Sequence, residues 1–226
     1  MKLDATIAYL RTKKRVLFLT TSNRWQGDKE IPKSTRIALA LKRKLGQKVT
    51  HIDIPVLNIT PCEGNVSRGA GNNCGPLAAR LLDKQKNPTG HHRCWASINN
   101  KQDELWKVSK ALFQSDCVVF FGSVRWGQMN SFYQKLIERL TWLENRRHTL
   151  GEKNLLKNIG AGVIVTGQNW NGEEVVKTQK KVLSYFGFRV VNELCWNWQF
   201  TKDAQDESMN SYKLAAKKFE KEVLER

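Results

Sequence analysis

Hydroxyl groups and basic side chains gather in one stretch that follows a short apolar run near the N-terminus. The stretch TTSNRWQGDKEIPKST, residues 20–35, supplies the hydroxyls of Thr20, Thr21, Ser22, Ser34 and Thr35, the amide of Asn23, and the positive charges of Arg24 and Lys33. It leads into a predicted helix, whose first backbone N–H groups favour an anion. The stretch therefore indicates a phosphate-binding loop. In the alternative interpretation Ser34 is an ordinary helix cap and the other side chains are solvated.

A second loop, GSVRWGQ, follows an apolar run further along the chain. It contains Ser123, Val124, Arg125, Trp126, Gly127 and Gln128. Trp126 and Met129 beside Gly127 would form a flat, partly apolar wall, and the backbone N–H groups of Gly127 and Gln128 would donate to the edge of a planar ring. Taken alone, Trp126 would favour packing in the core, which is the commoner role of tryptophan.

A third loop contains Gly167, Gln168, Asn169 and Trp170, and it follows another apolar run. It would close the opposite edge of the same ring. A phosphate at the first loop and a planar ring between the other two describe flavin mononucleotide (FMN). The chain lacks the GxxxxGK[ST] pattern of nucleoside triphosphate loops and the GxGxxG pattern of dinucleotide-binding folds.

Five apolar runs alternate with helical patterns along the chain. The strands are expected at residues 15–20, 48–54, 117–121, 160–166 and 188–195. The helices are expected at residues 33–45, 76–82, 100–114, 128–147, 173–186 and 203–224. The polar residues 21–32 are expected to form a loop. Alternating strands and helices predict an α/β three-layer sandwich, with a five-stranded parallel sheet and helices on both faces.

Five such strands suit the order 2-1-3-4-5, with the second strand at the edge. Ligands of these sheets bind beyond the carboxyl ends of the strands, at the point where the strand order reverses. The three loops would meet there. Residues 1–226 are therefore expected to form one domain, with a long loop excursion at about 55–99.

The excursion contains three of the five cysteines, Cys62, Cys74 and Cys94, and two adjacent histidines, His91 and His92. Eleven and nineteen residues separate the cysteines, which is not the compact spacing of an iron–sulfur motif. The histidines with Cys94 do not complete a four-ligand zinc set. No metal site is predicted, and packing or surface roles are favoured.

The formal net charge of +17 is concentrated near the N-terminus, because residues 1–50 hold 13 Lys/Arg and three Asp/Glu. This excess suits a phosphorylated ligand, a polyanion, or a solvated basic surface. Few and widely spaced cysteines, with no apolar segment long enough to span a bilayer, favour a cytoplasmic protein without membrane association.

The segment FGSVRWGQMNSFYQKLIERL resembles the ring-binding segment of the NAD(P)H-dependent FMN reductase and NAD(P)H quinone oxidoreductase family, which is flavodoxin-like. The matching positions are Ser123, Trp126, Gly127, Lys135 and Arg139, whereas Val124 replaces a proline and Glu138 replaces an aspartate. The first loop matches at Ser22-Asn23-Arg24, with Ser34 late after an inserted stretch.

The resemblance implies an FMN-dependent enzyme that transfers hydride from NAD(P)H through bound FMN to an acceptor such as a quinone or free flavin. It implies no catalytic side chain, since the flavin carries the chemistry. It places Ser22, Arg24, Ser34 and Thr35 near the phosphate. It places residues 123–128 and 167–170 around the ring.

Two other functions stay open on the sequence. A flavin-binding electron carrier would use the same loops without reacting with a nicotinamide. A polyanion-binding α/β protein would use the basic N-terminal segment, although no nucleic-acid module is recognised. A small-molecule acceptor is the expected partner, nucleic acid is disfavoured, and the excursion suits a homodimer contact or a lid.

Overall fold

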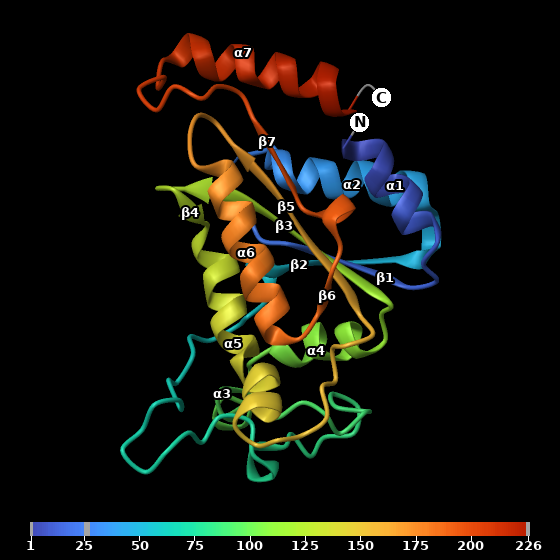
Figure 1. Ribbon diagram of the computed structural model, residues 1–226, viewed down its shortest axis with the longest axis vertical. Helices are drawn as coiled ribbons and strands as arrows, with labels where there is room; N and C mark the ends of the chain where they lie inside the picture. Colours follow the sequence, from blue (N-terminus) through green and yellow to red (C-terminus); the bar gives the residue numbers. More distant parts are fainter. Residues whose placement is uncertain (1, 25–27, 225–226) are drawn as a thin grey trace.

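A parallel sheet forms the centre of the computed structural model, which describes residues 2–24 and 28–224. Its strands follow the order β2-β1-β3-β5-β6 (Figure 1). Their bounds are β1 Val16–Thr20, β2 Val49–Asp53, β3 Cys117–Arg125, β5 Gly160–Gly167 and β6 Arg189–Val190. The predicted order 2-1-3-4-5 and the edge position of the second strand are confirmed. Part of the predicted loop 21–32, residues 25–27, lies outside the described residues.

The five residues of β1 are all buried, and alternate side chains of the sheet enter different cores. Leu17 and Leu19 pack with α4 Leu105–Phe113, α5 Ser131–His148 and α6 Gly172–Phe186. Val16 and Phe18 pack with α1 Lys2–Arg11, α2 Lys33–Leu45 and α7 Met209–Phe219. This alternation confirms the three-layer sandwich, since each sheet face buries its own helices.

The third strand is longer than predicted. Instead of ending at residue 121, β3 continues to Arg125 and pairs antiparallel with β4 Gln128–Met129. Trp126 and Gly127 form the two-residue turn, with φ angles of 49° and 72°. Positive φ at both positions is the geometry of a tight hairpin turn. The second loop is therefore largely the tip of a hairpin.

The fifth strand was predicted as one segment, residues 188–195, and this prediction was wrong. The chain forms β6, then the 3₁₀ turn Asn192–Leu194, then β7 Trp196–Gln199, which also pairs parallel with β5. Gly162 on β5 allows the turn to come close, because a Cβ built there would lie 2.1 Å from the Leu194 Cβ. Trp196 and Trp198 are then buried on the α1–α2–α7 side.

Several helix predictions need correction. Helix α1 was not predicted, and the stretch 76–82 contains only the 3₁₀ turn Leu77–Ala79. Residues 100–114 contribute α4 alone, preceded by the short α3 Trp95–Asn99. The last helix, α7, begins at Met209 and not at 203, and it ends in the π turn Glu220–Leu224. Two further 3₁₀ turns cover Gly46–Lys48 and Ile54–Val56.

The predicted excursion lies at the end of the molecule away from α7 (Figure 1). It consists mainly of turns between Ile54–Val56 and α4. None of the helices in the described ranges has the length and apolar composition needed to cross a membrane.

Candidate functional site

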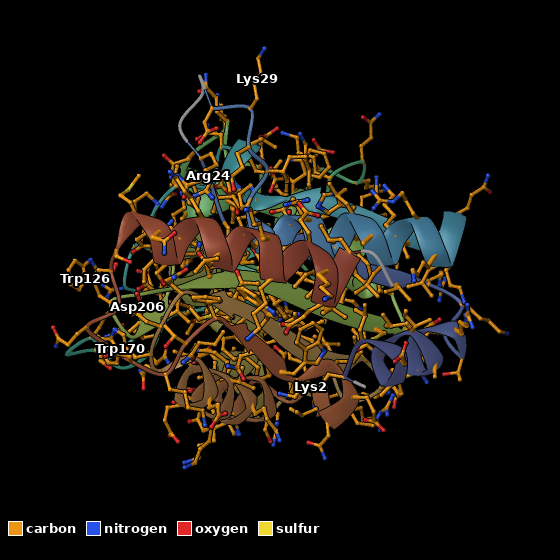
Figure 2. All side chains as sticks on the ribbon, turned by 90° about the horizontal axis from the view of Figure 1, so that it is seen from above. Lys2, Arg24, Lys29, Trp126, Trp170 and Asp206 are labelled. Atoms are coloured by element: carbon orange, nitrogen blue, oxygen red, sulfur yellow. The ribbon has the colours of Figure 1, made fainter. Side chains whose placement is uncertain are left out.

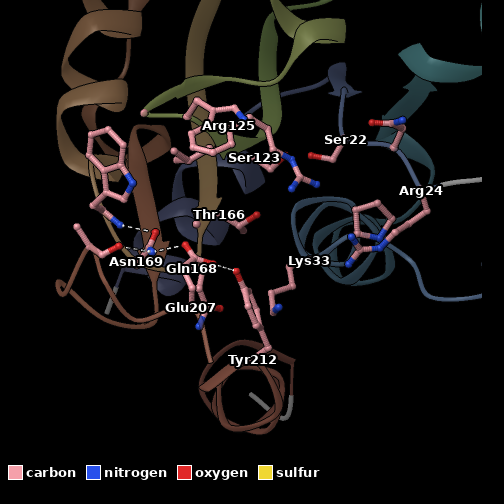
Figure 3. Close-up of a pocket in the computed structure, with 18 residues that line it drawn as sticks. Ser22, Arg24, Lys33, Ser123, Arg125, Thr166, Gln168, Asn169, Glu207 and Tyr212 are labelled. Carbon is pink, nitrogen blue, oxygen red and sulfur yellow. Dashed lines mark hydrogen bonds between the residues drawn. The ribbon is translucent and has the colours of Figure 1, made fainter. Parts of the chain in front are cut away.

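The three predicted loops line one cavity of about 680 Å³ beyond the carboxyl ends of β1, β3 and β5 (Figure 3). The predicted site residues that line it are Ser22, Arg24, Ser123, Val124, Arg125, Trp126, Gly127, Gly167, Gln168, Asn169 and Trp170. The convergence expected from the parallel topology is thus present in the structure.

Three predicted site residues do not line the cavity: Ser34, Thr35 and Gln128. Ser34 is fully buried and donates to the Ser22 Oγ atom at 2.8 Å, so it supports a lining residue. Thr35 is buried behind the wall, and Gln128 is exposed on the hairpin. Their place in the sequence was adjacent to the site, but helix and strand geometry turned them away.

The first loop presents unsatisfied donors at the start of α2. Pro32 occupies the N-cap position, where its side chain cannot accept from the first backbone N–H groups. The Arg24 Nε atom, on a residue that lines the cavity, is also buried without a hydrogen-bond partner among the described residues. Such groups need a partner, and an anion at this helix end would supply acceptors.

Positive charge surrounds the same helix end. Arg24 lies 3.4 Å from Glu30 and 3.8 Å from Asp28, so its charge is partly compensated. The pKa of Lys33 is lowered by burial, and the nearby Arg24 and Arg36 lower it further, although Glu30 opposes them. A bound anion would relieve this crowding of cations.

Asn130 ties the first loop to the second. Its Oδ1 atom accepts from Thr21 Oγ1 at 3.0 Å and from the Ser123 N–H at 3.2 Å, and its Nδ2 donates to the Thr21 carbonyl at 2.6 Å. Gly122 makes this contact possible, since a Cβ there would lie 3.0 Å from both Asn130 Oδ1 and Thr21 Oγ1. The Asn130 side chain therefore connects the two loops directly.

The hairpin tip carries the polar and aromatic groups of the second loop. The Ser123 Oγ atom is buried without a hydrogen-bond partner in the described part of the chain. The Arg125 guanidinium points into the cavity (Figure 3). Trp126 is 94% exposed at the turn, so the interpretation as a core residue was wrong. The predicted wall is also incomplete, because Met129 is buried beneath Gly122 and does not line the cavity.

The third loop packs against the hairpin tip. A Cβ at Gly127 would lie 2.7 Å from the Trp170 ring, so only glycine allows this approach. The Asn171 Nδ2 atom donates to the Gly127 carbonyl. Trp126 and Trp170 consequently lie at the same end of the molecule (Figure 2). Together they give the cavity an aromatic rim.

A fourth segment, between β7 and α7, completes the cavity and was missed. It contributes Ala204 and Glu207, and Tyr212 joins them from the first turn of α7. Asn169 Nδ2 donates to Glu207 Oε1 at 2.6 Å, and the Tyr212 hydroxyl donates to Glu207 Oε2, which raises the pKa of Tyr212 (Figure 3). The sequence analysis expected one helix over residues 203–224, so it did not predict a loop before residue 209.

One sequence signal could have found the fourth segment. Ser208 is the cap of α7, where its Oγ accepts from the Ser211 N–H at 3.1 Å. A serine followed by a helical pattern marks a helix start, which would have left residues 203–207 as a loop. Asn23 and Lys33, which the sequence analysis placed in the phosphate-binding loop, also line the cavity, as do Pro32 and Thr166, which it did not name as ligand-binding residues.

The excursion cysteines are free thiols within the described chain. Burial raises the pKa of Cys74 to about 12, with the neighbouring Cys94 and Cys62 adding to the effect. Within the described ranges, no group of three or more Cys, His, Asp or Glu side chains is arranged to hold a metal ion.

No protein-family model and no curated protein sequence matches the chain. Among solved structures, RosB with bound 8-demethyl-8-formylriboflavin-5'-phosphate is similar, with a TM-score of 0.55 and 13% identity over 91% of this chain and 73% of that chain. The azoreductase from Bacillus anthracis str. Sterne has a TM-score of 0.51 and 12% identity, over 94% of this chain and 100% of that chain.

The azoreductase AzrA is similar to the same degree, with a TM-score of 0.51 and 13% identity over 94% of this chain and 100% of that chain. At such identities the likeness concerns the fold. It agrees with the sheet order, the two helical layers and the resemblance read from the second loop. The chain has the flavodoxin-like fold that it shares with these reductase structures.

Proposed function

We propose that this protein is an FMN-dependent NAD(P)H oxidoreductase, which passes reducing equivalents to an acceptor such as a quinone or free flavin. One observation carries the proposal: three loops from β1, β3 and β5 line a single cavity whose one end has unsatisfied donors and whose other end has an aromatic rim. The similar RosB structure holds a riboflavin 5'-phosphate derivative.

The phosphate of FMN would lie at the first loop. Ser22, Arg24 and Lys33 would contact it, together with the first N–H groups of α2, which no side chain caps among the described residues. Ser34 would act through its hydrogen bond to Ser22. Hydrogen bonds to a charged group contribute about 1.5–3 kcal/mol each, so this end would supply a large share of the affinity.

The ring would lie between the hairpin tip and the third loop. FMN, when bound, supplies hydride transfer between a nicotinamide and an acceptor. The chain itself would orient the ring through the backbone of Gly127 and Gln168 and through the unsatisfied Ser123 hydroxyl. Arg125 would favour negative charge in the cavity, and the two tryptophans would restrict the access of water.

The experiment compares FMN with riboflavin, which lacks the phosphate. We expect the protein to bind FMN about 10- to 100-fold more tightly, measured by quenching of flavin fluorescence, because riboflavin leaves the first loop empty. NADPH or NADH added without oxygen should then bleach the flavin absorbance. A flavin that stays yellow would identify an electron carrier instead.

A pair of variants tests the place of the phosphate. Arg24→Ala should weaken FMN binding about tenfold and leave riboflavin binding unchanged. Lys29→Ala, in the same loop but pointing away from the molecule, is the matched control and should change neither (Figure 2). A protein that takes up no FMN in excess, and binds DNA with a steep salt dependence, would instead be a polyanion-binding protein.

A further inference from the structure

A second cavity, of about 600 Å³, lies where α5 ends and beside the last turns of α6. Helix α5 begins directly after the β3–β4 hairpin and has 18 residues, a length of roughly 26 Å at 1.5 Å per residue. The second cavity therefore lies at the far end of this helix from the candidate flavin site. Neither the proposed function nor the resemblance assigns a role to it.

Positive charge dominates the lining of this cavity. Arg147, Lys180 and Lys181 all face it. Lys180 Nζ donates to Asn192 Oδ1 at 2.8 Å, and Arg147 and Lys181 form no ion pair with any residue in the described ranges. The nearby Glu144 carboxylate is engaged, since His148 Nδ1 lies 2.6 Å from its Oε1 atom. Three cations thus converge with little compensation.

An aromatic platform forms one side of the same cavity. The rings of His148 and Tyr185 stack, with centroids 4.7 Å apart and an angle of 27° between their planes. Tyr185 is 62% exposed, although a tyrosine ring usually buries much of its apolar face. Its second face is available for stacking on a planar group.

We propose that this cavity binds a nucleoside diphosphate. The phosphates would lie against Arg147, Lys180 and Lys181, where charge-assisted hydrogen bonds are strong. The base would stack on Tyr185, which is held in place by His148. Such a site needs cations that are not neutralised and an exposed ring that is ordered on one face. Both occur here in one shallow hollow, where the three cations form no ion pair within the described ranges.

Calorimetric titration with three compounds tests the proposal, because ADP contains both parts whereas pyrophosphate and adenosine contain one each. At low ionic strength we expect ADP to bind at least tenfold more tightly than either fragment. The NMR signals of the Tyr185 and His148 rings should shift during the ADP titration. Pyrophosphate binding as tightly as ADP would overturn the role of the ring.

Two substitutions locate the binding. Arg147→Gln should weaken ADP about fivefold, as expected for the loss of one half-exposed charge, and Tyr185→Leu should weaken ADP but not pyrophosphate. Lys217→Gln makes the same charge change on α7, across the sheet, and should have no effect. Arg24→Ala should also have no effect, which separates this site from the flavin site. ADP binding that is lost in Arg24→Ala and kept in Arg147→Gln would overturn the proposal.

Discussion

Gly162 on β5 allows the turn at Leu194 to pack directly against this strand. A Cβ at this position would lie 2.1 Å from the Leu194 Cβ and 2.5 Å from the Leu194 carbonyl oxygen, and a backbone oxygen cannot move aside as a flexible side chain can. The edge strand is consequently interrupted at this turn. Local hydrophobicity gives no sign of such a contact, since both partners belong to apolar runs.

Gly162→Ala should therefore destabilise the protein. We expect a loss of about 3 kcal/mol in the free energy of unfolding, from overpacking against the turn at Leu194. Denaturation by urea measures it. Gly69→Ala is the control, because its Cβ would meet nothing within 4 Å and its φ is not positive. If the two variants had the same free energy of unfolding, the turn at Leu194 would be able to move away from the added methyl group at little cost, which would contradict this prediction.

The buried imidazole of His92 makes the free energy of unfolding depend on pH in the mildly acidic range. Burial lowers the pKa of His92 to about 4, and the nearby Arg139 adds to the effect. The unfolded chain, with an ordinary histidine pKa of about 6.5, takes up the proton at a higher pH than the native protein does. Stability should therefore be full above pH 6.5 and fall as the pH drops towards 4.

Urea midpoints measured between pH 7 and pH 4.5 check this dependence. His92→Gln should flatten the profile by about 2 kcal/mol over that interval. His91→Gln, which removes the neighbouring and less buried imidazole, should flatten it less. A wild-type profile without slope in this interval would contradict a neutral, buried His92.

At the scale of elements, the buried pair of Arg139 and Asp103 fastens the excursion to α5. Both side chains have no solvent exposure and their closest N–O distance is 2.7 Å. Arg139 also donates to the Thr60 carbonyl at 2.6 Å and to Ser97 Oγ at 3.0 Å. Arg139 was one of the residues on which the family resemblance rested, and in this chain it holds the excursion rather than the cavity.

Arg139→Met should release the excursion. Loss of one partner leaves a buried carboxylate unpaired, which costs about 3–5 kcal/mol. Limited proteolysis should then cut within residues 55–104 much faster than in the wild type. Lys135→Met, one turn earlier on α5, removes a charge that lies over the Phe132 ring and should leave the cutting rate unchanged. Equal rates in the two variants would contradict the anchoring role.

The same pair adds a second acid-sensitive step. Burial by itself would raise the pKa of Asp103, but hydrogen bonds from Arg139 and Thr60 outweigh it and lower the pKa to about 2. The stabilisation is complete above the ordinary aspartate pKa of about 3.9 and is lost as the pH falls through 2. The excursion should therefore stay attached through the pH range in which His92 titrates.

Two hydrophobic cores share one sheet. Alternate residues of β1, β3 and β5 belong to the core on either side, so unfolding of either helical layer would expose apolar residues of the shared sheet. We therefore expect residues 1–226 to unfold as one domain in a single calorimetric transition. Two separate transitions would show that the excursion or one layer forms an independent unit.

The amino-acid sequence was enough to predict the order of the main strands, the two helical layers and the three loops at the point where the strand order reverses. These features follow from the spacing of apolar residues, which is local and repeats along each element. The polar and aromatic residues of these loops, together with the family resemblance, selected eleven of the residues that line the cavity, from Ser22 to Trp170.

Contacts between distant parts of the chain set which of the predicted side chains reach the cavity and which segment closes it. Ser34 and Thr35 face inward because of the rotation of α2, and Glu207 and Tyr212 arrive from a segment far away in the chain. The break before β7 and the burial of Arg139 also depend on contacts between distant residues. Such contacts arise from packing in three dimensions, and hydrophobic periodicity, being local, carries no information about them.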